Sequence, residues 1–448
     1  MALRLDNVSA LLLLLIAFIG WVVIRYSCTY LDREPGEARF MRWLCATLAC
    51  VMLLVTAGTL LQLVAAWIAT SLALHRLLLF YPERSGARRA ARKKFVTARI
   101  GDVALIAAAL MLAHHYGTGD IASILGQARA GQGGTLAIVA AGLLALAAML
   151  KSAQFPLHGW LTEVMEAPTP VSALLHAGVI NAGGFLLIRF ADVMLLAPAV
   201  LAALVMVGGF TALFGGLAML TQPAVKTSLA WSTIAQMGFM IVQCGLALFP
   251  LALLHIVAHS LYKAHAFLAS GGAVERIAAE RRPGPIAVPD LRAVGFAFLA
   301  ALTIYALLTV ALNVDHKSPQ ALALGAILIF GVAYLLTQGL ADAAPRALTI
   351  RMSAYALAAS VSYFALHGFA LAMAGDVLPP TPPPGALGWV LIITALLSFG
   401  LVAVAQALFP LWVHHPAVAG LRVHLANGLY ANALFDRLTG GWAIRKAS

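Results

Sequence analysis

Charged side chains are scarce in this chain of 448 residues. Only 10% of the residues are Asp, Glu, Lys or Arg, whereas 62% are hydrophobic. Soluble globular domains are typically about a quarter charged and about half apolar, so this composition excludes an ordinary soluble domain. The apolar residues come in runs of about 20, the length that crosses a bilayer as a helix. Because each run in lipid must satisfy its own backbone hydrogen bonds, the sequence predicts an all-α, polytopic transmembrane helical bundle.

Several kinds of site have no counterpart in the sequence. The four cysteines form no CxxC pair and no disulfide framework, which favours small packing residues over metal ligands or bridges. There is no phosphate-cradling Gly-rich loop and no convincing Ser-His-Asp order, which disfavours ATP-driven transport and hydrolysis. These absences disfavour an enzyme, and we expect no metal and no cofactor in this chain.

Basic residues outnumber acidic ones, with 29 Lys and Arg against 17 Asp and Glu and a formal net charge of +12. In a soluble protein this excess would suggest nucleic acid, but no basic patch interleaved with aromatic residues supports such a partner. The basic residues instead gather in a few connections and the tail. One such connection, after the third expected span, contains Arg84, Lys93 and Lys94. The positive-inside rule places this side in the cytoplasm. We expect a multi-pass membrane protein, in contact with the membrane lipids, with the N-terminus outside and the C-terminus cytoplasmic.

Thirteen spans are expected in a transmembrane domain over residues 1–411. They lie near 8–26, 39–58, 60–80, 97–116, 135–155, 169–190, 199–220, 224–248, 250–271, 292–313, 318–340, 347–371 and 386–411. The fifth ends in Lys151-Ser-Ala-Gln-Phe-Pro156, which predicts a discontinuous helix because proline breaks it just after a lysine. Residues 412–448 are expected to form a cytoplasmic tail, in which His424 to Arg437 is a candidate amphipathic helix for lipid or partner docking.

Ionisable residues inside the expected spans are the candidates for function. Lys or Asp at the centre of a spanning helix costs about 3 kcal/mol, so such a residue needs an explanation. Lys151 lies beside the proline break, where it either exchanges protons or snorkels toward the membrane surface. His255, His259 and Lys263 follow one another at intervals of four on one helix face, which suits a proton wire. Histidines four residues apart also occur in zinc sites, but no third ligand is apparent here.

Four further residues have two interpretations each. Lys226 is either part of the pathway or an anchor at the cytoplasmic end of its helix. Asp102, beside Arg99, is either a functional carboxylate or one half of an interfacial ion pair. The acidic residues after the proline break are either ordinary loop charges or the entry for cytoplasmic protons. These acidic residues are Glu163 and Glu166, and His176 in the sixth expected span is a further candidate.

Three ordered segments resemble the signatures of the proton-translocating antiporter-like subunits. That superfamily includes the L subunit of respiratory complex I and the large subunit of multisubunit cation/proton antiporters. The segments run from Lys151 to His176, from Lys226 to Gly238 and from His255 to Lys263. The resemblance implies that buried proton-pathway positions are occupied by Lys151, Lys226, His255, His259 and Lys263, with His176 beside them.

One departure separates this chain from the respiratory subunits. Their third span carries Gly-Trp-Glu, whose glutamate pairs with the lysine, whereas this chain reads Ala66-Trp67-Ile68. Lys151 must therefore find its counter-charge elsewhere. The candidates are Asp102, Glu163 and a partner protein.

Over nearly its whole length the sequence is similar to the membrane subunit of the bacterial DAB-type inorganic carbon pumps. The resembling stretches include residues 66–81, 90–95 and 176–184. The resemblance implies a large cytoplasmic partner, a DabA-type zinc subunit similar to a β-carbonic anhydrase, that hydrates CO2 to bicarbonate. This chain would supply the flux of protons, in preference to sodium, that makes hydration one-way. The alternatives are a subunit of a cation/proton antiporter or redox-driven pump, and a structural membrane anchor for an enzyme.

Overall fold

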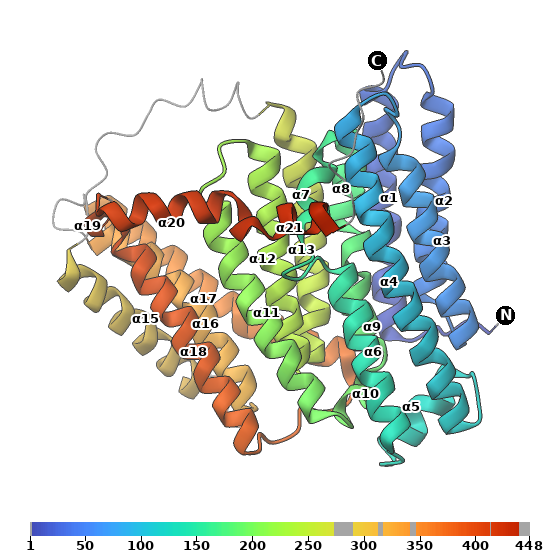
Figure 1. Ribbon diagram of the computed structural model, residues 1–448. Helices are drawn as coiled ribbons and strands as arrows, with labels where there is room; N and C mark the ends of the chain where they lie inside the picture. Colours follow the sequence, from blue (N-terminus) through green and yellow to red (C-terminus); the bar gives the residue numbers. More distant parts are fainter. Residues whose placement is uncertain (1, 273–289, 312–316, 341–345, 413, 439–448) are drawn as a thin grey trace. The chain divides into compact units, whose positions relative to one another are not determined.

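The computed structural model describes residues 2–272, 290–311, 317–340, 346–412 and 414–438 (Figure 1). Helices make up most of the described chain. No strand occurs in these ranges, and the only extended pairings there are two isolated bridges, Leu3 with Ala57 and Thr59 with Asp120. The prediction of an all-α bundle is confirmed.

The chain divides into two compact units. The first comprises Met1–Val274, Met373–Pro379 and His424–Ser448. Its helices are α1 (Asn7–Tyr30), α2 (Glu37–Val55), α3 (Leu60–Leu78), α4 (Ser85–Tyr116), α5 (Ile121–Arg129), α6 (Thr135–Lys151), α7 (Gly159–Glu163), α8 (Thr169–Ala177), α9 (Ala182–Arg189), α10 (Ala191–Leu195), α11 (Pro198–Met219), α12 (Val225–Gly245), α13 (Phe249–Leu268) and α21 (Ala431–Leu438). Short 3-10 turns, η1 (Val164–Glu166), η2 (Val179–Asn181) and η5 (Gly428–Tyr430), link some of them.

The second unit comprises Glu275–Ala372 and Pro380–Val423. Its helices are α15 (Leu291–Ala311), α16 (Pro319–Leu340), most of α17 (Arg346–Ala374), α18 (Ala386–Ala407) and α19 (Phe409–Trp412). Helix α20 (Pro416–Ala426) runs across the sequence boundary between the units. Neither unit ends at residue 411, so the expected division into a membrane domain and a tail stays a prediction.

Ten of the described helices are long and apolar enough to cross a membrane. Two further apolar helices, Thr135–Lys151 and Pro319–Ala333, are shorter. Every expected range contains a helix, but thirteen crossings are not confirmed. The shortfall has physical reasons: α6 stops at Lys151, and α12 carries polar residues such as Lys226 and Gln243.

Helix α4 begins twelve residues earlier than its expected start at residue 97. Its first turns bury Ala87, Ala90, Ala91 and Lys94, which recur at the three- and four-residue spacing of one helix face. Lys93 is buried as well. The expectation that both lysines belong to a surface connection is therefore wrong, because small alanines allow this basic segment to continue the helix against its neighbours.

The expected break near Lys151 is present. Helix α6 ends at Lys151, and regular helix resumes only at Gly159 in α7. The backbone between them is satisfied by side chains: Gln154 Nε2 donates to the carbonyl of Ser152 at 2.8 Å, and the Phe155 amide donates to Thr211 Oγ1 at 3.1 Å. Irregular backbone at membrane depth is tolerated where protein covers and pairs it in this way.

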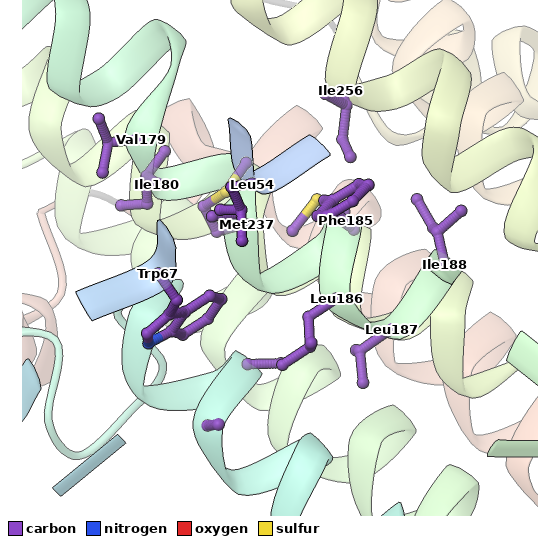
Figure 2. Close-up of a cluster of buried hydrophobic side chains, with 14 of the residues drawn as sticks. Leu54, Trp67, Val179, Ile180, Phe185, Leu186, Leu187, Ile188, Met237 and Ile256 are labelled. Carbon is purple, nitrogen blue, oxygen red and sulfur yellow. The ribbon is translucent and has the colours of Figure 1, made fainter. Parts of the chain in front are cut away.

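Large side chains from several helices meet in the core of the first unit. Figure 2 shows Leu54 of α2, Trp67 of α3, Phe185 of α9, Met237 of α12 and Ile256 of α13 in one buried cluster. Lipid is as apolar as these side chains, so close packing, not exclusion from water, holds such helices together. The cluster fixes the helices that carry the ionisable residues.

Glycines let α11 and α12 approach closely. A methyl group added at Gly238 of α12 would lie 2.5 Å from the backbone nitrogen of Ala212 and 2.7 Å from the carbonyl oxygen of Gly208, both on α11. Small residues at helix contacts are a recurrent device of membrane bundles. No larger residue fits at position 238 unless the two helices separate.

Replacing Gly238 with valine should lower the stability of the first unit by about 1–3 kcal/mol through overpacking. The measurement is the thermal unfolding midpoint of the purified protein in detergent. Gly216→Val is the matched control, because Gly216 lies on α11 with no atom within 4 Å of an added methyl group. Equal midpoints for the two variants would contradict the packing argument.

Candidate functional site

Lys151 lies in a buried charge cluster formed by α3, α4 and α6. Its side-chain Nζ is 4.5 Å from the centroid of the Trp67 ring and has no hydrogen-bond partner among the described residues. Trp67 Nε1 donates to Asp102 Oδ1 at 3.1 Å. The other carboxylate oxygen, Oδ2, lies 2.5 Å from Arg99 Nη2. The indole therefore stands between the ammonium group and the carboxylate and touches both.

Lys151 interacts electrostatically with the carboxylate of Asp102. Arg99 interacts electrostatically with both of these residues. Two cations thus share one buried anion. A buried ammonium is stable only when its charge is compensated and its protons are hydrogen-bonded, and Lys151 meets the second condition poorly. An amine in this position is suited to giving up its proton and taking it back.

Glu163 lies in a different cluster, at the break between α6 and α8. Lys93 Nζ is 2.5 Å from Glu163 Oε1, 2.5 Å from Asp436 Oδ1 and 2.8 Å from Asn432 Oδ1. Glu163 is therefore paired with Lys93 and with the C-terminal helix α21, and not with Lys151. Glu166 is exposed, with its side chain against Gly86 at the start of α4.

The C-terminal segment forms two helices in place of one continuous amphipathic helix over His424–Arg437. Helix α20 ends at Ala426, and a turn with positive φ at Gly428 and Leu429 precedes α21. Figure 1 shows α21 beside α7. The contact depends on Gly159, because an added methyl group there would collide with Asn432.

The row on α13 has the expected arrangement. The rings of His255 and His259 lie 6.0 Å apart, and His255 Nδ1 is 2.9 Å from Gln243 Oε1. Lys263 is fully buried, and its Nζ donates to the Leu229 carbonyl at 3.1 Å. No third His, Cys, Asp or Glu joins the two histidines as a metal site in the part of the chain that the structure describes.

His176 joins this row from α8. Its Nδ1 is 3.0 Å from Thr233 Oγ1, and its ring stacks on Phe267 at 4.4 Å. His176, His259 and Lys263 lie close enough to interact electrostatically. Lys226 is half-buried, and its Nζ donates to Thr169 Oγ1 at 2.9 Å. In the described hydrogen bonds, Lys226 therefore contacts the start of α8 and none of the residues of the α13 row.

Helix α8 separates the two groups of titratable residues. Leu175 of α8 lines a small cavity together with Val179, Ile180 and Lys151. His176, the residue directly after Leu175, belongs instead to the α13 row, where its ring stacks on Phe267. The ionisable side chains among the described residues that line this cavity are Lys94 and Lys151, and no described hydrogen bond or ion pair joins either of them to the α13 row. A proton that crosses it needs water, a movement of α8, or both.

Sequence reasoning missed two members of the Lys151 site. In the sequence, Trp67 stands out only by the isoleucine that follows it, and Lys94 is one of many cations in a basic run. Lys94 is buried on α4 and lines the same cavity as Lys151. The spacing Ala87, Ala90, Ala91, Lys94 was the signal that could have placed it on a packed face.

Replacing Asp102 with asparagine should leave Arg99 and Lys151 without their buried counter-charge and lower stability by about 3 kcal/mol. The thermal unfolding midpoint in detergent measures the change. Asp32→Asn is the control, since Asp32 and Arg33 form an exposed pair at 3.8 Å. Exposed pairs contribute little, so this variant should unfold like the parent protein. A parent-like midpoint for Asp102→Asn would rule out the proposed compensation.

Comparison with known families gives two matches. Residues 57–312 match the transmembrane family described as NADH:quinone oxidoreductase/Mrp antiporter, and residues 1–41 match the N-terminal region of chain 5 of NADH-ubiquinone oxidoreductase, complex I. The first match covers more than half of the chain and includes the whole segment from α3 to α13 that carries both groups of titratable residues.

Two curated relatives are named as carbon transporter subunits. The probable inorganic carbon transporter subunit DabB of Hydrogenovibrio crunogenus is 48% identical over 294 residues, which are 65% of this chain and 57% of that protein. The probable inorganic carbon transporter subunit DabB2 of Halothiobacillus neapolitanus is 37% identical over 98% of this chain and 80% of that protein. The chain thus spans little more than half of one relative and most of the other.

A solved structure has a similar fold. The structure of the Mrp complex from Dietzia sp. DQ12-45-1b superposes with a TM-score of 0.66 at 25% identity, over 98% of this chain and 52% of that one. The likeness agrees with an antiporter-like fold.

Proposed function

Because this chain belongs to the NADH:quinone oxidoreductase/Mrp antiporter transmembrane family, we propose that it conducts cations as the membrane subunit of an inorganic carbon pump. The names of its relatives, at 37% and 48% identity, support the link to carbon transport. The chain is a transport subunit and not an enzyme. The protein lies in the bacterial inner membrane, with the N-terminus outside and the C-terminus in the cytoplasm.

The observation that carries this proposal is the buried amine of Lys151, which has no hydrogen-bond partner among the described residues and shares its carboxylate with Arg99. Amines and imidazoles exchange protons, whereas metal cations are conducted past oxygen ligands. The two groups of the site consist mainly of lysines and histidines. Protons are therefore favoured over sodium as the conducted ion.

The pathway has two stages, separated by α8. One stage is the Lys151 site with Asp102, and the other contains His176, His255, His259 and Lys263. Lys226, at the start of α12, contacts α8 and lies where movement of α8 would be felt. Protonation of one stage changes its charge and so shifts the packing of the elements between the stages, as in other charge-driven switches.

The partner is a large cytoplasmic subunit of the DabA type, similar to a β-carbonic anhydrase and carrying the zinc that hydrates CO2. Each cation that moves down 100 mV supplies about 2.3 kcal/mol, which is more than one decade of bias toward bicarbonate. The segment between Lys151 and Glu163 leads from the site to α21, and this connection offers a route by which protonation reaches the partner.

A second candidate function is that of a subunit in a cation/proton antiporter. The similarity of the fold to the Mrp complex favours this function. The two functions differ in their partners. The tagged chain, co-expressed with a neighbouring β-carbonic-anhydrase-like gene product, should purify with it and with stoichiometric zinc. A neighbourhood of small antiporter subunits, with no zinc in the purified complex, would favour the antiporter.

Lys151→Ala and Lys263→Ala should each abolish growth rescue at air-level CO2 in a strain that lacks its own carbonic anhydrase. Each removes an amine from one stage of the pathway. His265→Ala is the control, because His265 is exposed on the same helix as Lys263. An uncoupler should abolish rescue by the unaltered complex. Full rescue by both lysine variants would exclude conduction through these residues and leave the membrane-anchor role.

A further inference from the structure

Lys94 is a second buried lysine beside Lys151, and neither the sequence motifs nor the proposed pathway accounts for it. Its side chain comes from α4 and is 5% exposed. Nζ donates to the Ser71 carbonyl at 2.7 Å and to Ser71 Oγ at 2.9 Å, both on α3. Both acceptors are neutral, and no carboxylate pairs with Lys94 in the described ion pairs.

The neighbouring lysine shows what a structural buried cation looks like in this protein. Lys93 is 3% exposed, and its Nζ contacts the carboxylates of Glu163 and Asp436. Its charge is fully compensated, as expected for a buried ion that only stabilises the fold. Lys94, one residue later and equally buried, has no such compensation.

Lys94 and Lys151 line one cavity. It offers about 20 Å³ for the centres of water molecules, which is room for one. Thr97 supplies a hydroxyl to its wall, and the rest is largely apolar, with Leu74, Leu150 and Trp160 among the lining residues. A single water molecule fits in this space, whose wall includes both Lys94 and Lys151.

The charges around this cavity do not balance. The titratable and charged groups that face Lys94 are His75 of α3, Arg99 and Asp102 of α4, and Lys151 of α6. Asp102 is the one carboxylate among them, and Arg99 already pairs with it at 2.5 Å. Two ammonium groups that line one small buried cavity repel each other, which disfavours the state in which Lys94 and Lys151 are both charged.

We propose that Lys94 is a further proton-carrying residue, which exchanges one proton with Lys151 through a water molecule in the shared cavity. The proposal rests on the proposed function. The ammonium of Lys151 gives its proton to the water, and the water gives a proton to the neutral amine of Lys94. Lys151 is left neutral, Lys94 becomes the ammonium held by Ser71, and the water is restored.

Lys94 lies on the side of Lys151 that leads to the basic end of α4. It precedes Asp102 by eight residues, about 12 Å along the helix axis. Exposed arginines, Arg88, Arg89 and Arg92, continue from there to the surface that the loop charges assign to the cytoplasm. The lysine pair therefore connects the centre of the first unit with its basic surface.

The test is proton flux into membrane vesicles that contain the assembled complex, followed with a pH-sensitive dye under an imposed potential. Lys94→Met removes the amine, and Lys94→Arg keeps a charge and hydrogen-bond donors that cannot lose a proton. Both should lower flux by about tenfold or more. Arg92→Met, the control, removes an exposed charge from the same helix and should leave flux unchanged. Flux is divided by the amount of chain in the membrane, so that poor assembly is not mistaken for lost conduction.

Lys151→Ala in the same assay separates this proposal from the one on which it rests. Loss of flux in Lys151→Ala together with unchanged flux in Lys94→Arg would overturn the role of Lys94 alone, since a fixed charge would then suffice. Unchanged flux in Lys151→Ala would overturn the proposed function itself. Loss of flux in both Lys94 variants and in Lys151→Ala, with the control unchanged, supports the exchange.

Discussion

The cost of holding the Lys151 ammonium away from water is the constraint on which the rest of the first unit depends. Trp67 presents its ring to the ammonium and its N–H to Asp102, so one indole couples the cation to its counter-charge. This requires α3, α4 and α6 to meet at one depth. The helix ends at Lys151, and the irregular segment beyond it is paired by side chains and packed among α7 and α11. The same contacts therefore determine both the geometry of the site and the packing of α3, α4 and α6.

The same constraint explains why the titratable residues occur in two groups. Charges of one sign cannot be concentrated in a site of low dielectric constant, so His176 and the α13 row are kept apart from Lys151 by the apolar residues of α8 and η2. The described structure holds this partition closed. Conduction then requires that water enter it or that α8 shift, and the contact between Lys226 and Thr169 joins α12 to the end of that helix.

The helices and the interrupted segment were predictable because their causes are local. Apolar length marks a span, and proline beside a lysine marks a break. Lys94 was not predictable by counting charges, because a basic run normally lies at the surface, and only the alanines before it place it on a buried face. Glu163 shows the converse: it follows the break in sequence, as an entry residue would, yet its carboxylate binds Lys93 and the distant Asn432.

The sequence by itself determined that this is an all-helical membrane protein, where most of its helices run, and which helices carry Lys151, Lys263 and the candidate histidines, because hydrophobic length and residue spacing act within a few turns. It also showed that the carboxylate expected beside Trp67 is replaced by Ile68. Only the tertiary structure decided which residue takes over. Asp102 was one candidate among several until the packing of α3 on α4 brought it to the indole of Trp67. Contacts between residues 35 to 339 positions apart depend on how helices pack, and no local pattern records that.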